Sequence, residues 1–114
     1  MLELEYMKLI KDKKKHLRTL EGDDLVYALK MLGNKYRLNM LVLLSTNPGL
    51  TLDQINEKVG GDFKNISMHM TKLSKSGLVY KNHKGKYVLH SLTRYGTVAV
   101  KSFRLFQQVE NVQY

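Results

Sequence analysis

Apolar residues recur at spacings of three and four along most of the chain, which is the pattern of helices with one buried face. The first such stretch covers residues 1–24, and its apolar positions are Leu2, Tyr6, Leu9, Ile10, Leu17 and Leu20. The Gly-Asp-Asp sequence at 22–24 combines a stop signal with cap-type residues, which predicts that a second helix starts at Leu25. Gly33 and Asn34 are expected to end this second, short helix.

A third helix is predicted over residues 36–44, where Leu and Met are dense enough for burial on most sides. The Asn-Pro-Gly turn at 47–49 ends it, and we expect it to lie at the centre of the core. Thr51 is a typical N-cap residue for a fourth helix of about two turns. The pair Gly60–Gly61 follows and can adopt the positive φ of a tight turn.

A fifth helix and a β-hairpin come next. Asp62 is expected to cap the helix, and Gly77 stands where a left-handed C-terminal residue belongs. The apolar residues of this helix recur at intervals of four and three: Ile66, Met70 and Leu73. Two apolar runs, 78–80 and 87–89, then predict a hairpin with Gly85 at its tip.

Thr93 is expected to cap a last helix, which carries apolar or small residues along one side. These residues are Tyr95, Val98, Ala99, Ser102, Leu105, Phe106 and Val109. The chain is therefore expected to be mainly α-helical with one small β-hairpin. Helix, glycine turn, helix and hairpin in this order are the layout of a winged helix-turn-helix, here with extra helices at the N- and C-terminal ends.

This layout divides the 114 residues into three parts within one domain-sized chain. Residues 1–24 and 93–114 are expected to form terminal helices for dimerisation, and residues 25–92 the winged helix-turn-helix. An apolar helix stripe must be buried somewhere, so we expect a two-fold homodimer, although both helices could instead cover the core of their own monomer. The expected dimer interface consists of Leu2, Tyr6, Ile10, Leu17, Tyr95, Val98, Ser102, Leu105, Phe106 and Val109.

Composition narrows the range of functions. The absence of Cys excludes disulfides, thiolate metal sites and cysteine nucleophiles. The four histidines have no ligand spacing, so neither a metal nor another cofactor is expected; they are His16, His69, His83 and His90. No catalytic cluster emerges, so an enzyme is not expected. No apolar run approaches the roughly 18 residues that span a bilayer and no signal peptide is evident, so we expect a cytoplasmic protein without a membrane partner.

Charge then points to an anionic partner. The chain has 19 Lys and Arg against 10 Asp and Glu, a net charge of +9. Residues 61–91 hold six lysines against one aspartate, so +5 of the +9 lies in this segment. A uniformly basic surface would not concentrate its charge in this way.

The concentrated charge lies on the predicted recognition helix, about residues 63–76, and on the hairpin that follows it. Stepping 100° per residue puts the apolar side of the helix opposite a side of lysines and short polar residues. We expect this helix to enter the major groove of double-stranded DNA and the wing, residues 80–88, to contact the backbone. The expected DNA-binding residues are Lys64, Asn65, Ser67, Met68, Thr71, Lys72, Lys75, Lys81, Lys84 and Lys86. The alternative is a solvated lysine face beside a hairpin whose charges resist aggregation.

Two stretches resemble winged-helix regulators of the ArsR type. Residues 28–41, ALKMLGNKYRLNML, are similar to the Ala-Leu-x-x-Leu-Gly turn and Arg-Leu-x-Ile-Leu pattern of that family. Residues 66–73, ISMHMTKL, with the Gly-Leu-Val at 77–79, resemble its recognition helix and exit. The resemblance covers about residues 25–95. It implies a homodimeric DNA-binding transcription regulator, usually a repressor on a pseudo-palindromic operator, whose terminal helices form the dimer interface.

The resemblance also places the family's DNA-contacting positions on Phe63, Lys64, Ser67 and Met68. Ser67 is retained, whereas Phe63 and Met68 depart from the usual residues, so the operator sequence does not carry over. The metal-sensing Cys pairs and Asp-His sets of the family are absent. We therefore expect a sequence-specific homodimeric repressor. The alternatives are a sequence-neutral DNA-compacting protein and a winged helix that binds RNA or a protein partner.

Overall fold

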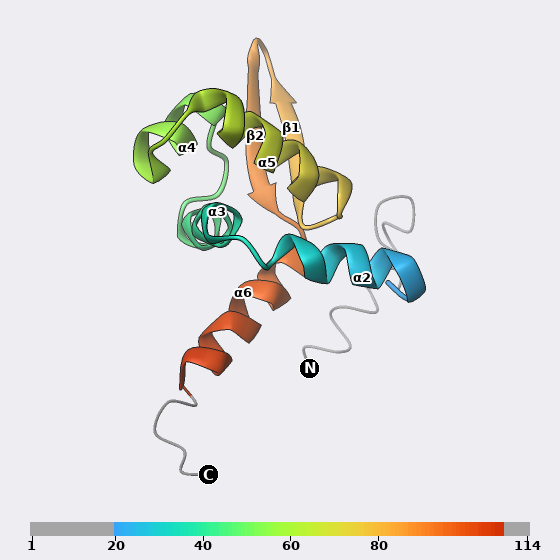
Figure 1. Cartoon of the computed structure of the whole chain (residues 1–114). Coiled ribbons are helices and arrows are strands. Elements are labelled where there is room, and N and C mark those ends of the chain that lie inside the picture. Colours follow the sequence, from blue (N-terminus) through green and yellow to red (C-terminus); the bar gives the residue numbers. More distant parts are fainter. Residues whose placement is uncertain (1–19, 109–114) are drawn as a thin grey trace.

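The computed structural model describes residues 20–108, which form five helices and one two-stranded antiparallel sheet (Figure 1). The elements in order are α2 (Gly22–Met31), α3 (Lys35–Thr46), α4 (Leu52–Val59), α5 (Phe63–Lys75), β1 (Val79–Lys84), β2 (Tyr87–Leu92) and α6 (Arg94–Gln107). The tip of the hairpin and the C-terminal end of α6 point in opposite directions (Figure 1). The prediction of a mainly helical fold with one hairpin is confirmed. The expected N-terminal helix falls largely on residues outside the described range.

Local capping explains where three of the helices begin, as predicted. Thr51 and Gln54 form a capping box at the start of α4, with Thr51 N 2.9 Å from Gln54 Oε1. Asp62 Oδ1 accepts a hydrogen bond from Lys64 N at 3.2 Å, and Thr93 Oγ1 accepts one from Gly96 N at 3.1 Å. These bonds satisfy backbone donors that a helix leaves unpaired in its first turn.

The start of α2 and the role of Asn34 differ from the prediction. The helix begins at Gly22 rather than at Leu25, and its N-cap Glu21 makes no side-chain cap bond. Asp23 lies inside the first turn instead of before it, where the helix dipole favours a negative charge. Asn34 does not end α2 but caps α3, accepting a hydrogen bond from Arg37 N at 3.0 Å.

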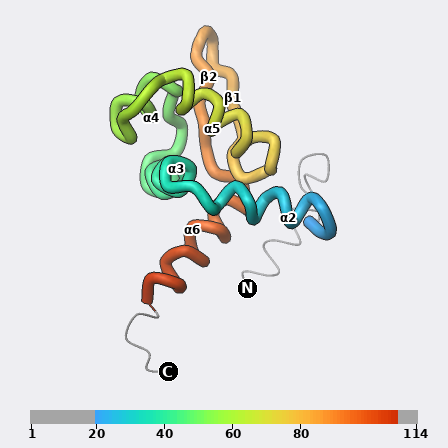
Figure 2. The backbone as a smooth tube through the Cα atoms, in the orientation of Figure 1, coloured from blue at the N-terminus to red at the C-terminus, as the bar shows by residue number. Residues whose placement is uncertain are grey.

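The core is built around α3, as the density of Leu and Met predicted. Met40 and Leu41 are fully buried, and α3 contacts α4, α5, α6 and β2. Figure 2 shows α3 end-on, with α4 on one side and α6 on the other. Ile55 of α4 and Leu73 of α5 pack into the same cluster, so the two short helices of the motif are held by burial against α3.

Helix α2 buries only a small part of its apolar surface. Only Ala28 and Met31 are buried on this helix. Leu25, Val26 and Leu29 of this helix are exposed. Helix α2 thus carries more apolar side chains than it buries, and the remainder lie on the surface of the monomer.

The hairpin is anchored at its base by a short bridge to the segment before α4. His90 N donates to Leu50 O at 2.8 Å, and Gly49 N donates to His90 O at 2.9 Å. The His90 ring is buried, and its Nδ1 lies 2.9 Å from Leu50 O. Because a carbonyl only accepts, Nδ1 carries the proton and donates. Burial lowers the pKa of His90, and nearby Lys81 adds to this, although the bond to Leu50 opposes it.

A second anchor joins the end of α5 to the start of α6. Thr93 Oγ1 donates to Gly77 O, and Thr93 N donates to Leu78 O at 3.1 Å. Gly96 packs directly on this backbone: a Cβ built on it would lie 2.1 Å from Leu78 O. The close approach of helix and chain at this point therefore requires a glycine.

We expect Gly96→Ala to lower the free energy of unfolding by about 2 to 3 kcal/mol, measured by urea denaturation. Alanine favours a helix more than glycine does, but the clash with a backbone carbonyl outweighs that gain. Gly33→Ala is the matched control, since its Cβ would lie 3.6 Å from the nearest atom, and its effect should stay within about 0.5 kcal/mol. Equal effects of the two substitutions would contradict the close packing at Gly96.

We also expect buried His90 to make stability depend on pH. Because the pKa of His90 is lower in the folded protein than in the unfolded chain, its stabilising effect is complete above about pH 6.5. Below that pH the unfolded chain takes up a proton that the folded protein resists, and stability falls by up to about 1.4 kcal/mol per pH unit. The free energy of unfolding of His90→Asn, which keeps an N–H donor, should fall less steeply with decreasing pH than that of the wild type. His83→Asn changes an exposed ring and should leave the slope unaltered; equal slopes for all three proteins would refute the assignment.

Candidate nucleic-acid interface

Helix α5 presents one buried face and one polar, basic face. Its buried residues are Ile66, His69, Met70 and Leu73. The residues predicted to meet DNA lie away from this core: Lys64, Asn65, Met68, Thr71 and Lys75 are exposed, and Ser67 and Lys72 are half-buried. The predicted separation of an apolar and a basic side is therefore present in the fold, and only His69 is on the buried side unexpectedly.

The exposed face combines cations with polar and apolar groups of the kind that can contact base edges. Met68 is 48% exposed and offers an apolar contact on a helix surface otherwise rich in polar atoms. Thr71 Oγ1 donates to Ser67 O within the helix at 3.0 Å, so the Thr71 hydroxyl can still accept a hydrogen bond. Phe63, at the first turn, is also exposed. The surface can thus contact both phosphates and bases.

The three lysines of the hairpin are all exposed, but they do not share one face. In the antiparallel register Lys81 lies opposite His90, and Lys84 lies opposite Tyr87. Side chains alternate along a strand, so Lys81 and Lys84 project from opposite sides of the sheet. Lys86 belongs to the two-residue turn with Gly85, whose φ is 60°. The structure therefore brings Lys84 and Lys86 together at the tip and leaves Lys81 nearer the base.

Two exposed tyrosines accompany these lysines, and sequence reasoning assigned them no role. Tyr87 is 55% exposed, and the Nζ of Lys86 lies 5.5 Å from its ring centroid. Tyr80 is 51% exposed on β1. The tip of the hairpin thus combines the basic Lys84 and Lys86 with the aromatic Tyr87, whereas Tyr80 lies near the base.

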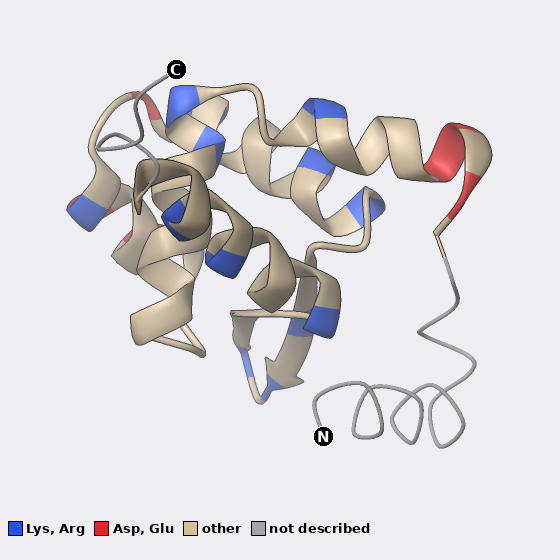
Figure 3. Ribbon diagram, turned by 90° about the horizontal axis from the view of Figure 1, so that it is seen from below, with Lys and Arg blue, Asp and Glu red and all other residues tan. Residues whose placement is uncertain are grey.

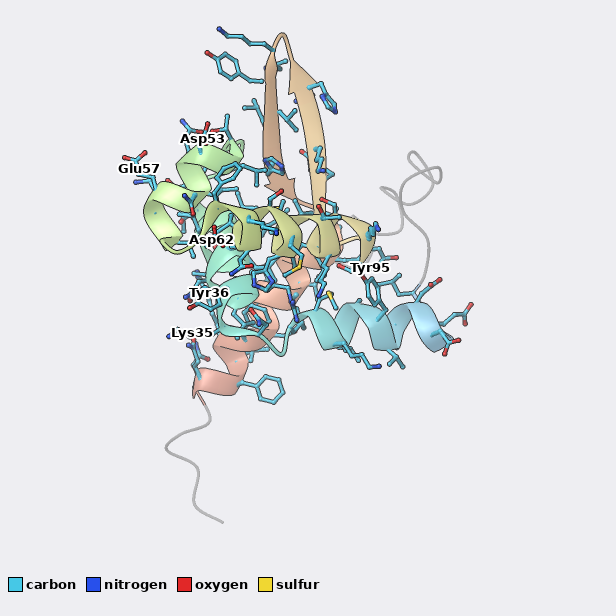
Figure 4. The ribbon with its side chains drawn as sticks, turned by 45° about the horizontal axis from the view of Figure 1, so that its top comes forward. Lys35, Tyr36, Asp53, Glu57, Asp62 and Tyr95 are labelled. Atoms are coloured by element: carbon cyan, nitrogen blue, oxygen red, sulfur yellow. The ribbon has the colours of Figure 1, made fainter. Side chains whose placement is uncertain are left out.

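Several acidic residues of the described segment lie away from this surface, whereas Asp62 caps α5 itself. Glu21, Asp23 and Asp24 lie at the N-terminal end of α2, as the red segment of Figure 3 shows. Glu57 projects from α4 away from the hairpin (Figure 4). The basic groups of α5 and the hairpin are thus spatially separated from most of the negative charge.

Beneath the exposed face lies a polar cluster that sequence reasoning missed. No role for His69 was expected from the sequence, and its side chain is only 9% exposed. Its Nδ1 lies 3.2 Å from Nη1 of buried Arg37, whose Nε donates to Met31 O at 2.8 Å. Tyr36 stacks on the His69 ring with a centroid distance of 5.9 Å and an interplanar angle of 13°. Lys35 and Tyr36 project from the start of α3 (Figure 4).

The position of Arg37 was the signal that could have revealed this cluster. Arg37 precedes Met40, Leu41 and Leu44 by three, four and seven residues, which places it on the buried face of α3. A guanidinium on such a face requires acceptors. Arginine cannot accept a hydrogen bond, so the Nδ1 of His69 must be unprotonated when it receives one. Burial, followed by the charges of Arg37 and Lys72, lowers the pKa of His69 and favours this neutral form.

The described part of the expected dimer stripe is mostly on the monomer surface. Val98, Leu105 and Phe106 are exposed, and Phe106 is 81% exposed. Tyr95 and Ser102 are half-buried, and the core side of α6 is formed by Gly96, Ala99 and Val100. The other expected interface residues lie outside the described part of the chain: Leu2, Tyr6, Ile10, Leu17 and Val109.

Metal-binding and membrane-spanning geometry are both missing from the described part of the chain. Within residues 20–108, no three His, Cys, Asp or Glu side chains are arranged to hold a metal ion. Over the same range no helix has the length and apolar character needed to cross a bilayer.

No protein-family model matches the chain, and no curated protein matches it significantly. Among solved structures, HlyU from Vibrio cholerae N16961 has a TM-score of 0.65 at 24% identity, over 75% of this chain and 94% of that one. A homodimeric winged helix-turn-helix domain of a possible ArsR-family regulator from Mycobacterium bovis has a TM-score of 0.65 at 25% identity, over 78% and 80%. The repressor PagR of Bacillus anthracis has a TM-score of 0.64 at 20% identity, over 71% and 93%. The fold implied by the resemblance in residues 25–95 is confirmed: the chain has the winged helix-turn-helix fold that these regulators share.

Proposed function

We propose that the chain is a sequence-specific, double-stranded-DNA-binding transcription regulator and acts as a homodimeric repressor. The observation that carries this proposal is the exposed face of α5, where lysines alternate with short polar residues beside a basic hairpin. The fold supports the proposal, because structures that share it are described as a transcriptional repressor and as a DNA-binding domain. In such folds the second helix of the motif enters the major groove.

The proposed contacts divide into two kinds. Lys64, Lys72 and Lys75 on α5 and the lysines of the wing neutralise phosphates, which gives affinity without sequence preference. Asn65, Ser67, Met68 and Thr71 face the base edges and provide sequence preference. Of the wing lysines, Lys84 and Lys86 are the stronger candidates, since both lie at the tip of the hairpin.

We further propose that residues 25–92 bind DNA and that the terminal segments, 1–24 and 93–114, pair two copies. The exposed apolar side chains of α6 support this, since a stripe of this size is normally covered in the working protein. A two-fold dimer presents two recognition helices about 34 Å apart, which matches one turn of DNA and favours a palindromic site.

We expect the double substitution Lys84→Gln/Lys86→Gln to weaken binding to every duplex by a similar factor. The slope of log affinity against log salt should also become shallower, by about 0.9 for each phosphate that is no longer neutralised. Fluorescence anisotropy over a salt series measures both quantities. Lys30→Gln/Lys101→Gln removes the same charge from exposed positions on α2 and α6 and should leave the slope nearly unchanged.

Ser67→Ala completes this experiment, because it removes a base-facing hydroxyl without a change in charge. It should alter the ranking of fragments selected from the source genome, whereas the wing variant should not. Equal affinity of the wild type for its own promoter and for random duplex at about 0.15 M salt would instead favour a sequence-neutral DNA-compacting protein. Preferential binding of RNA would favour an RNA-binding winged helix. A protein that binds neither DNA nor RNA would favour a winged helix that binds a protein partner.

For the dimer, we expect Leu105→Ser/Phe106→Ser to shift the sedimentation equilibrium from dimer toward monomer. Both side chains are exposed in the monomer, so the free energy of unfolding of each protomer should change by no more than about 0.5 kcal/mol. Gln107→Ser, on the same turn of α6, serves as the control and should remain dimeric. A wild-type protein that sediments as a monomer at micromolar concentration would overturn this part of the proposal.

A further inference from the structure

The polar cluster beneath α5 connects three helices through one side chain. Arg37 of α3 donates from Nε to the carbonyl of Met31, the last residue of α2, at 2.8 Å. Its Nη1 lies 3.2 Å from Nδ1 of His69, the middle residue of the Phe63–Lys75 helix. A guanidinium is a rigid fork of donors, so it fixes the distance and orientation of both acceptors.

We infer that Arg37 and His69 are positioning residues for DNA binding: they hold α5 against α3, and this hold lasts only while His69 is unprotonated. The inference rests on the proposed function of α5 and adds a condition under which that function operates. The residues next to His69 on the helix are Met68 and Met70, of which Met68 belongs to the exposed face. A shift of His69 therefore moves the DNA-facing side chains with it.

Protonation removes the hold for two reasons. A protonated Nδ1 has no lone pair left, so it cannot accept the hydrogen bond from Arg37. The same proton also creates a second cation 3.2 Å from the guanidinium in a buried site. Attraction between the two side chains is thereby replaced by repulsion.

The surroundings of His69 offer no compensating negative charge within the described residues. From α3 the ring meets Arg37 on one side and the stacked Tyr36 on another, and Lys35 Nζ lies 5.9 Å from the Tyr36 ring. On α5 itself the charge that acts on the ring is Lys72, and α2 contributes the Met31 carbonyl, already occupied by Arg37. Burial and the two cations lower the pKa of His69, so the ring takes up its proton only below the usual range of histidine.

The test compares the wild type with His69→Asn in binding to a duplex selected at neutral pH. The Oδ1 of asparagine can replace Nδ1 as the acceptor, but asparagine does not titrate. The two proteins should bind alike at about pH 8, and the wild type should lose about fivefold in affinity relative to the variant once the pH is brought below the usual titration range of histidine. All other histidines are common to both proteins, so their titration cancels in the ratio of the two DNA affinities. Circular dichroism at each pH checks that both proteins remain folded.

A further variant makes the result specific. His69→Leu removes the acceptor and should bind weakly at every pH, with no additional loss on acidification. The inference is overturned if the wild type and His69→Asn have the same pH profile. It is also overturned if the wild type gains affinity on acidification relative to the variant, which would mean that protonated His69 contacts a phosphate.

A measurement without DNA separates this inference from the proposed function. Amide hydrogen exchange of α5 should quicken on acidification more in the wild type than in His69→Asn, once the intrinsic pH dependence of exchange is removed. If this difference is found but neither protein binds DNA at about pH 8, the positioning role stands and the proposed function fails. If both proteins bind DNA and exchange shows no difference, the function stands and the positioning role fails.

Discussion

The burial of α3 on most of its sides is the constraint on which the rest of the fold depends. Helices of 8 and 13 residues, such as α4 and α5, are marginal in water on their own. They persist because Ile55 and Leu73 enter the same apolar cluster as Met40 and Leu41 of α3. The orientation of the basic face follows from this packing, since turning the apolar side of α5 inward leaves the lysines no other direction than outward.

Local sequence signals were sufficient to predict most of the fold. Thr51, Asp62 and Thr93 act as caps through bonds to residues two or three positions away, and such bonds can be foreseen from spacing alone. The hairpin was equally local, because Gly85 and the flanking apolar runs determine where the chain reverses. The exposed face of α5 was predictable for the same reason: the period of a helix fixes which residues lie opposite the core.

Features that depend on contacts between distant segments could not be foreseen in this way. Arg37 and His69 are 32 positions apart, and no local pattern indicates that one will accept a bond from the other. The exposure of apolar residues on α2 is a similar case. Which of them are buried depends on the neighbouring helices, and these cover only Ala28 and Met31. The wing lysines show a third limit, since their density is evident in the sequence but the register of the strands decides that Lys81 and Lys84 face opposite ways.

The bridge between Leu50 and His90 fixes the base of the hairpin relative to the segment that precedes α4. It joins the base of the hairpin to the residue just before the Thr51 cap, so the wing and the first helix of the motif share one anchor. The distance from this anchor to the tip then depends on the number of residues in each strand, at about 3.4 Å per residue. That increment is close to the spacing of successive phosphates along one DNA strand, about 3.4 Å along the helix axis. In the proposed complex with DNA, the length of β1 and β2, rather than the number of lysines they carry, would therefore determine which phosphate the tip can reach.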